Sequence, residues 1–176
     1  MNDPMRILKA DHREVAQLLT RLADTDEGTE RENLVSEVEK KLGLHMELEE
    51  SLVYDLVEEH VGAEDKEEAE IEHGLVRETL TKLREMVEQP GFGAVVEMLK
   101  GGIGHHVEEE EREILPELKD AMGNAEWRDL GDRIADAKQA AGIPVAQPQT
   151  AKRRSAKRKP RGSTAASNKS RAAGKR

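Results

Sequence analysis

One pattern of histidine and glutamate occurs twice in this chain at the same spacing, and it restricts the fold more than any other feature. In each copy a histidine is followed 33 residues later by the motif HxxxE, whose two polar residues lie about one helical turn apart. Corresponding positions of the two copies are separated by 61 residues. The pattern predicts two related helical hairpins that supply four imidazoles and two carboxylates to one centre. Its members are His12, His45 and Glu49 in the first copy and His73, His106 and Glu110 in the second.

Apolar residues recur at helical spacing around each of the four histidines. Asp3 and Pro4 are typical of a helix N-cap and the first helical position. The periodicity stops at stretches that contain Gly28, Gly62 and Pro90, which are residues that interrupt helices. Four helices are therefore predicted: from Pro4 to about residue 23, across Leu34–Leu56, from about Glu64 to Gln89, and from near Phe92 across Ile114.

The sequence predicts an all-α protein, namely an up-down four-helix bundle with a short fifth helix and a disordered basic C-terminal tail. Aromatic residues make up only 2% of the chain, whereas β-sandwiches and barrels normally contain more aromatic and β-branched residues. Trp127, Leu130 and Ile134 indicate the fifth helix. The expected domains are a helical bundle over residues 1–142 and a Lys/Arg-rich tail over residues 143–176, where apolar periodicity is absent.

The residue types of the repeated pattern favour a metal centre. The chain has no cysteine, so a metal must be bound by nitrogen and oxygen. A lone histidine on an apolar stripe is more often a packed core residue than a ligand. Four histidines and two glutamates in one interior would strongly destabilise it without a cation. Six ligands exceed what one zinc ion uses, so we expect two metal ions. A metal-free helical scaffold is the alternative, and the inward polar side chains disfavour it.

The segments around these residues resemble the hemerythrin-like family, often called the HHE cation-binding domain. They read KADHREV at His12, HMELEESLVYDL from His45, EIEHGLV at His73 and HVEEEEREILP from His106. The resemblance covers roughly residues 1–140. It implies a non-haem centre of two iron ions with an oxo or hydroxo bridge, and manganese or zinc is less expected. His105 and Glu109 also have the HxxxE spacing, but the 61-residue offset and the position of Pro116 select His106.

One position departs from the oxygen carriers of this family. They have an additional histidine one turn after the third-helix histidine, where this chain has Arg77. The resemblance then implies an open coordination position. It favours reaction with peroxide, oxygen or nitric oxide by a catalase- or peroxidase-like protein of oxidative or nitrosative stress defence. The alternative is an oxygen- or iron-binding sensor without turnover. A ferritin-like centre would need two Glu-x-x-His motifs, and only Glu70-x-x-His73 is present.

Further polar residues accompany the pattern. Tyr54 follows His45 by nine residues, which is half a turn away on an ideal helix. It reaches the centre, as a ligand or hydrogen-bond donor, only if the helix is kinked, and packing between helices is the alternative. Asp11 and Glu72 each precede a candidate ligand histidine and are themselves candidates for the layer of residues that supports the ligands. The other acids of these clusters are predicted to be solvated or to pair with Lys and Arg; they are Glu47, Glu50, Glu109 and Glu111.

Charge is distributed unevenly. Residues 151–176 contain 11 Lys or Arg and no Asp or Glu, so the net charge of −9 leaves −20 for the preceding residues. The tail is predicted to bind nucleic acid or another polyanion without sequence preference, because it has no aromatic side chain for stacking. The protein's own acidic body and an anionic membrane surface are alternative partners. The basic residues in question are Lys152, Arg153, Arg154, Lys157, Arg158, Lys159 and Arg161.

The sequence also indicates a location. No segment has the roughly 18 consecutive apolar residues of a membrane span, and the first ten residues lack the apolar core of a secretory signal. The cytoplasm is therefore the expected location.

Overall fold

The computed structural model describes residues 2–145, and every regular element in this range is a helix. α1 spans Pro4–Ala23. α2 (Thr29–Leu48) continues through the π-helical segment η1 (Glu49–Val53) into α3 (Tyr54–His60). α4 spans Ala63–Glu85, and α5 (Phe92–Glu109) continues through the π-helical segment η2 (Glu110–Ile114) into α6 (Leu115–Ala121). The last helix, α7, spans Asn124–Ala140. No helix in this range is both long and apolar enough to cross a membrane.

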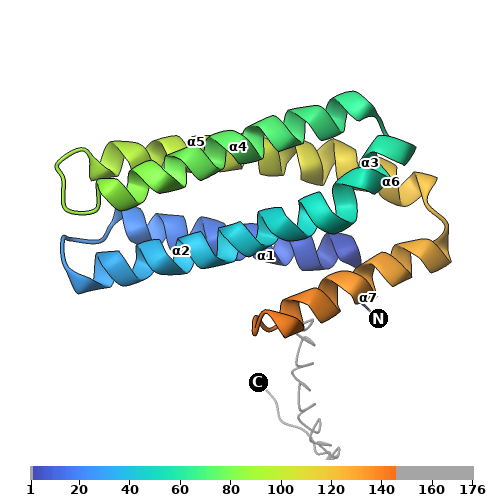
Figure 1. The fold of residues 1–176 in the computed structure, drawn as a ribbon, viewed down its shortest axis with the longest axis horizontal. Coiled ribbons are helices and arrows are strands. Elements are labelled where there is room, and N and C mark those ends of the chain that lie inside the picture. Colours follow the sequence, from blue (N-terminus) through green and yellow to red (C-terminus); the bar gives the residue numbers. More distant parts are fainter. Residues whose placement is uncertain (1, 146–176) are drawn as a thin grey trace, which may run out of the picture. The chain divides into compact units, whose positions relative to one another are not determined.

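Two antiparallel hairpins lie side by side in the bundle (Figure 1). The first consists of α1 and the continuous helix α2–η1–α3, and the second of α4 and α5–η2–α6. α7 follows as a fifth helix and packs against α1 and η1. The predicted all-α, up-down four-helix bundle with a fifth helix is therefore confirmed. The predicted tail lies, from residue 146 onward, outside the described residues.

Local sequence explains where the first two helices begin. The Asp3 side chain accepts a hydrogen bond from the Arg6 backbone N–H at 3.2 Å, and Pro4 occupies the first helical position, as predicted. Gly28 precedes α2 with a φ of 125°, a conformation that side chains with a Cβ rarely adopt. These two positions determine where the helices of the first hairpin begin.

The interior contains two apolar clusters with a polar layer between them. One cluster is formed by residues such as Leu19, Leu42 and Leu83 near the α1–α2 and α4–α5 turns. The other lies toward the opposite end of the four helices, and α7 contributes Trp127 and Ile134 to it. The repeated histidines and glutamates fall between these clusters along every helix of the bundle. Apolar packing at both ends therefore holds the polar layer in place.

Both long helices contain a π-helical segment, and each segment begins at the glutamate of an HxxxE motif. The backbone N–H of Tyr54 donates to the carbonyl of Glu49, and the N–H of Leu115 donates to the carbonyl of Glu110, which are bonds across five residues. Such a segment accommodates one additional residue in a turn and so rotates all later side chains by about a quarter turn. The two segments are related by the same 61-residue offset as the motifs.

Candidate metal centre

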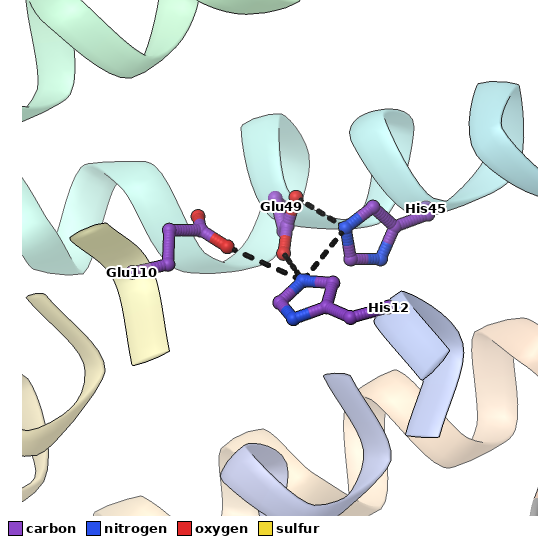
Figure 2. A group of neighbouring side chains, drawn as sticks. All are labelled: His12, His45, Glu49 and Glu110. Carbon is purple, nitrogen blue, oxygen red and sulfur yellow. Dashed lines mark hydrogen bonds and ion pairs between the residues drawn. The ribbon is translucent and has the colours of Figure 1, made fainter. Parts of the chain in front are cut away.

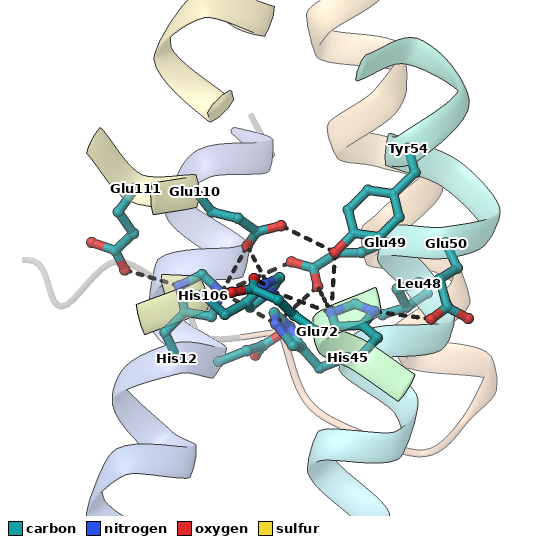
Figure 3. Close-up of polar contacts among 12 residues, drawn as sticks. His12, His45, Leu48, Glu49, Glu50, Tyr54, Glu72, His106, Glu110 and Glu111 are labelled. Carbon is teal, nitrogen blue, oxygen red and sulfur yellow. Dashed lines mark hydrogen bonds and ion pairs between the residues drawn. The ribbon is translucent and has the colours of Figure 1, made fainter. Parts of the chain in front are cut away.

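The six residues of the repeated pattern converge in the polar layer, and each is at most 5% exposed. The six residues come from α1, α2, η1, α4, α5 and η2. Figures 2 and 3 show five of them, with His12, His45, Glu49, His106 and Glu110 labelled. Two groups of side chains offer ligand atoms that lie within 4.8 Å of one another, and Glu49 belongs to both groups. The groups are His12, His45, Glu49 and Glu110, and Glu49, His73 and His106.

The imidazoles are arranged in two pairs. The Nε2 atoms of His12 and His45 are 3.1 Å apart, and those of His73 and His106 are 3.2 Å apart. We call the first pair, from α1 and α2, the first half of the centre. The second pair, from α4 and α5, is the second half.

Both inner carboxylates span the two halves. Glu49 Oε2 lies 3.1 Å from His45 Nε2 and 3.5 Å from His73 Nε2. Glu110 Oε2 lies 3.5 Å from Nε2 of His12 and 3.5 Å from Nε2 of His106. Each carboxylate therefore contacts one imidazole of each pair, which is the arrangement that bridging of two cations requires.

A second layer of carboxylates faces the outer nitrogens. The Nδ1 of His12 lies 2.9 Å from Glu111 Oε1, and that of His73 lies 2.9 Å from Glu50 Oε1. His106 Nδ1 lies 2.9 Å from Glu72 Oε2 (Figure 3). Because an ionised carboxylate only accepts hydrogen bonds, each of these Nδ1 atoms is the N–H donor. The Nε2 lone pairs of these imidazoles then point into the centre, as metal ligation requires.

The fourth histidine differs in this respect. His45 Nδ1 lies 3.9 Å from Asp11 Oδ2 and has no hydrogen-bond partner among the described residues. Asp11 and Glu72, the two acids singled out in the sequence, each face a histidine of the other long helix of their hairpin. Glu72 accepts a hydrogen bond from His106, whereas Asp11 does not bond to His45.

Two orienting residues were missed at the sequence level. Glu50 and Glu111 do pair with Arg77 and Lys9, as predicted for acids of these clusters, but each also accepts a hydrogen bond from an imidazole. The sequence does contain a signal that could have identified them. Glu50 and Glu111 are separated by 61 residues, the same offset that relates the ligand candidates of the two copies.

The electrostatics of the inner layer favour positive charge. Burial opposes ionisation of Glu49, but His45, His12 and His73 outweigh it and hold the pKa of Glu49 well below its usual range. Burial likewise opposes protonation of His12, yet the Glu110 and Glu49 carboxylates raise its pKa to about 10. The carboxylates of this layer therefore stabilise positive charge, which in the metal-free protein is carried by protonated His12.

The donor atoms fit a pair of metal ions. Both carboxylate oxygens of Glu49, and Oε2 of Glu110, are buried without a hydrogen-bond partner among the described residues. Such atoms are costly unless a cation contacts them. The paired imidazole nitrogens, 3.1 and 3.2 Å apart, are the donors that would hold the cations together with these carboxylates.

Tyr54 reaches the centre because of η1. Its side chain is buried, and its hydroxyl oxygen lies 3.0 Å from His73 Nε2 and 3.4 Å from Glu110 Oε1. On an ideal helix Tyr54 would point half a turn away from His45, and the irregularity that brings it to the centre is the π-helical segment between the two residues. Burial and the neighbouring carboxylates raise the pKa of Tyr54, so the phenol keeps its proton in the metal-free protein.

Other sequence candidates lie away from the centre. His105 is exposed on α5 and faces Glu72 and Glu109, so the structure brings His106 into the cluster instead. His60, which has no counterpart in the repeated pattern, is half-buried at the end of α3. Glu70 is exposed on α4, so it does not lie with His73 in the buried cluster as a ferritin-like Glu-x-x-His motif would require. The basic residues between Lys152 and Arg161 lie outside the described residues.

A small cavity of about 10 Å³ adjoins all four imidazoles. Apart from the imidazoles its lining is apolar, with Val15, Leu42, Met46, Val76, Ile103 and Val107. The volume is about that needed for one water-sized molecule.

Comparisons with known proteins agree with this geometry. A family model described as hemerythrin HHE cation binding domain matches residues 3–118, more than half of the chain and both copies of the pattern. The chain is also similar to a protein from Mycobacterium kansasii, whose crystal structure is described as a hemerythrin HHE cation binding domain-containing protein and Rv2633c homolog. The TM-score is 0.71 and the identity 25%, over 81% of this chain and 89% of that chain. No curated protein matches the chain.

Proposed function

We propose, from the premise that this chain belongs to the hemerythrin HHE cation-binding domain family, that it holds two iron ions and reacts with peroxide, oxygen or nitric oxide. The observation that carries the proposal is the pair of inner carboxylates, Glu49 and Glu110, whose buried oxygens lack partners among the described residues while facing two imidazole pairs. Manganese and zinc have similar ligand preferences and are the less expected ions.

The residues of the centre have distinct proposed roles. The imidazoles of both halves and the two inner carboxylates, Glu49 and Glu110, would together hold the ions. Bound iron supplies redox chemistry and coordination positions that a small ligand can occupy. The outer carboxylates Glu50, Glu72 and Glu111 hold the imidazole rings in the orientation and tautomer that ligation needs.

Tyr54 is proposed to act in the second half of the centre, as a ligand or as a hydrogen-bond donor. Its hydroxyl is within 3.4 Å of both a ligand candidate, His73, and a bridging candidate, Glu110. A buried phenol at this point provides one proton donor beside the ions.

The apolar cavity supports a small reactant. It adjoins all four imidazoles and is walled otherwise by side chains such as Val76 and Ile103, so larger or charged molecules are excluded. Oxygen, nitric oxide and peroxide are of suitable size. Arg77, which stands where the oxygen carriers have a histidine, bonds to Glu50 and does not contribute a ligand among the described contacts.

Metal analysis of the purified chain tests the proposal. About two iron ions per chain are expected, with loss of at least one in His106→Ala, and the exposed neighbour variant His105→Ala should retain both. Peroxide and nitric oxide turnover are then compared in the iron-loaded and metal-free proteins. A folded chain that takes up no iron from ferrous solution would refute the proposal.

Iron uptake without turnover of either reactant would instead favour the alternative, a binding or sensing protein. The polyanion binding predicted for the basic tail, and the cytoplasmic location, stay predictions. Retention on immobilised DNA that disappears at high salt would test the former.

A further inference from the structure

α7 brings one charged side chain close to the metal centre. The ammonium group of Lys138 lies 2.5 Å from both carboxylate oxygens of Asp11. Lys138 is only 4% exposed and Asp11 only 8%. A lysine is almost never buried unless it is paired, so each group fixes the other. α7 lies beyond residues 3–118, the segment that matches the family model.

Asp11 is the carboxylate that faces His45. Its counterpart in the other hairpin is Glu72, 61 residues later, which accepts a hydrogen bond from His106 at 2.9 Å. Asp11 Oδ2 instead lies 3.9 Å from His45 Nδ1, beyond hydrogen-bond distance. The burial of the two side chains is similar, but Asp11 is one methylene shorter than Glu72, and an ammonium group contacts both of its oxygens.

We propose that Lys138 is a positioning residue, which withholds Asp11 from His45 and thereby makes the first half of the metal centre unlike the second. An imidazole whose Nδ1–H donates to a carboxylate is a more basic ligand. His45 lacks that support, so it is the weakest of the four donors. The consequence for metal binding rests on the proposed function, whereas the hydrogen-bond arrangement itself does not.

Proton exchange at the ring nitrogens tests the arrangement directly. In Lys138→Met the nearest donor left to Asp11 is His45 Nδ1–H, and the two groups should bond. We expect solvent exchange of that proton, followed by NMR in the metal-free chain and in the chain loaded with diamagnetic Zn²⁺, to slow by about tenfold, the factor for one hydrogen bond to a charged group. Lys138→Arg keeps the ion pair and should exchange like the natural chain.

Two further variants separate positioning from simple stabilisation. Asp11→Asn/Lys138→Met removes both charges, so it should show no slowed exchange at His45. Lys41→Met is the matched control, because Lys41 and Glu14 form an exposed ion pair, 2.7 Å apart. Both residues line a second small cavity, which Lys138 also lines. Lys41→Met should leave His45 unchanged. Equal exchange at His45 in all these variants would overturn the proposal and leave Lys138 with a role in docking α7 only.

Release of Fe²⁺ to a chelator tests the consequence. The natural chain should release its two ions in two phases, and Lys138→Met should slow the faster phase by about tenfold. If Lys138→Met does not fold, Asp11→Asn decides the question: it should barely alter release, whereas Glu72→Gln should accelerate it. Equal acceleration by both would overturn the proposal. If the chain takes up no iron, the proposed function fails, and the exchange measurement still decides the role of Lys138.

Discussion

The first and second halves of the metal centre use equivalent positions of two hairpins, yet their immediate surroundings differ. On the side of the π-helical segments, the second half receives the Tyr54 hydroxyl, and the equivalent position after η2 is Leu115, which has no polar group. On the other side, the first half has an aspartate bound by Lys138, and the second has Glu72 bound directly to His106. The repeat thus provides the ligand set, while departures from the repeat distinguish the two proposed ions.

The two halves also depend on each other. Glu111 of the second hairpin orients His12 of the first, and Glu50 of the first orients His73 of the second. Each hairpin therefore lacks one of its own orienting carboxylates. This exchange explains why a centre of this kind needs both copies of the pattern packed together.

The largest effect is expected from removing the residue that both halves share. Glu49→Gln keeps the volume but removes the charge that both groups of ligand atoms use. Metal content, measured by elemental mass spectrometry, should fall from about two ions per chain to well below one, because the bridging carboxylate neutralises both cations. Glu110→Gln removes the other carboxylate that faces both imidazole pairs, so its metal content should also fall, but less, because only Glu49 belongs to both groups of ligand atoms. Full occupancy in Glu49→Gln would contradict the bridging role.

The next effect concerns the outer carboxylates. Glu72→Gln and Glu50→Gln each replace the charged acceptor of one imidazole of the second half with a neutral amide, whose oxygen accepts a weaker hydrogen bond. Metal affinity, measured by competition with a chelator, should fall by about 10- to 100-fold in each. Glu109→Gln, an acid on the same face that bonds to no imidazole of the centre, is the control. Equal affinities in the three variants would exclude an orienting role.

Substitution of Tyr54 should have a smaller effect, confined to the second half of the centre. Tyr54→Phe keeps the ring and removes the hydroxyl near His73 and Glu110, so the metal-free protein should lose about 1 kcal/mol in the free energy of unfolding. If the phenol binds or donates to iron, the visible absorption of the loaded protein should also change. Leu115→Met tests the equivalent position of the other half and should leave the absorption unaltered.

The smallest effect is expected at Arg77. Its guanidinium donates to Glu50 at 2.7 Å from an exposed position, and exposed ion pairs contribute about 1 kcal/mol or less. Arg77→Gln should therefore keep both metal content and urea stability close to those of the natural chain, since Glu50 retains its bond to His73. A loss of one ion would show that the orientation of Glu50 depends on Arg77.

Much of this structure could be predicted from periodicity alone. Apolar spacing located the helices, and Asp3 with Pro4 located the start of α1, because these features act within a few residues of sequence. The 61-residue offset placed six polar residues in one layer and chose His106 over His105. Both arguments use local geometry or simple repetition, which a single sequence displays directly.

The remaining features depend on contacts or on helix irregularity. The π-helical segments have no distinctive residue pattern, so the direction of Tyr54 could not be decided. Glu50 and Glu111 stand in runs of glutamate that also contain exposed acids such as Glu47 and Glu113, and only the fold shows which acids of each run face an imidazole. Lys138 continues the stripe of Trp127, Leu130 and Ile134 along α7, but the sequence does not identify its partner Asp11, which lies 127 positions away.

The π-helical segments also carry information about ancestry. Each is a one-residue expansion of a helix, and both lie at the same place in their hairpins, directly at the HxxxE glutamate. A single insertion before the duplication accounts for both, whereas two later insertions would have to coincide. On that account the expansion would precede the duplication, and the difference between Tyr54 and Leu115 would follow it.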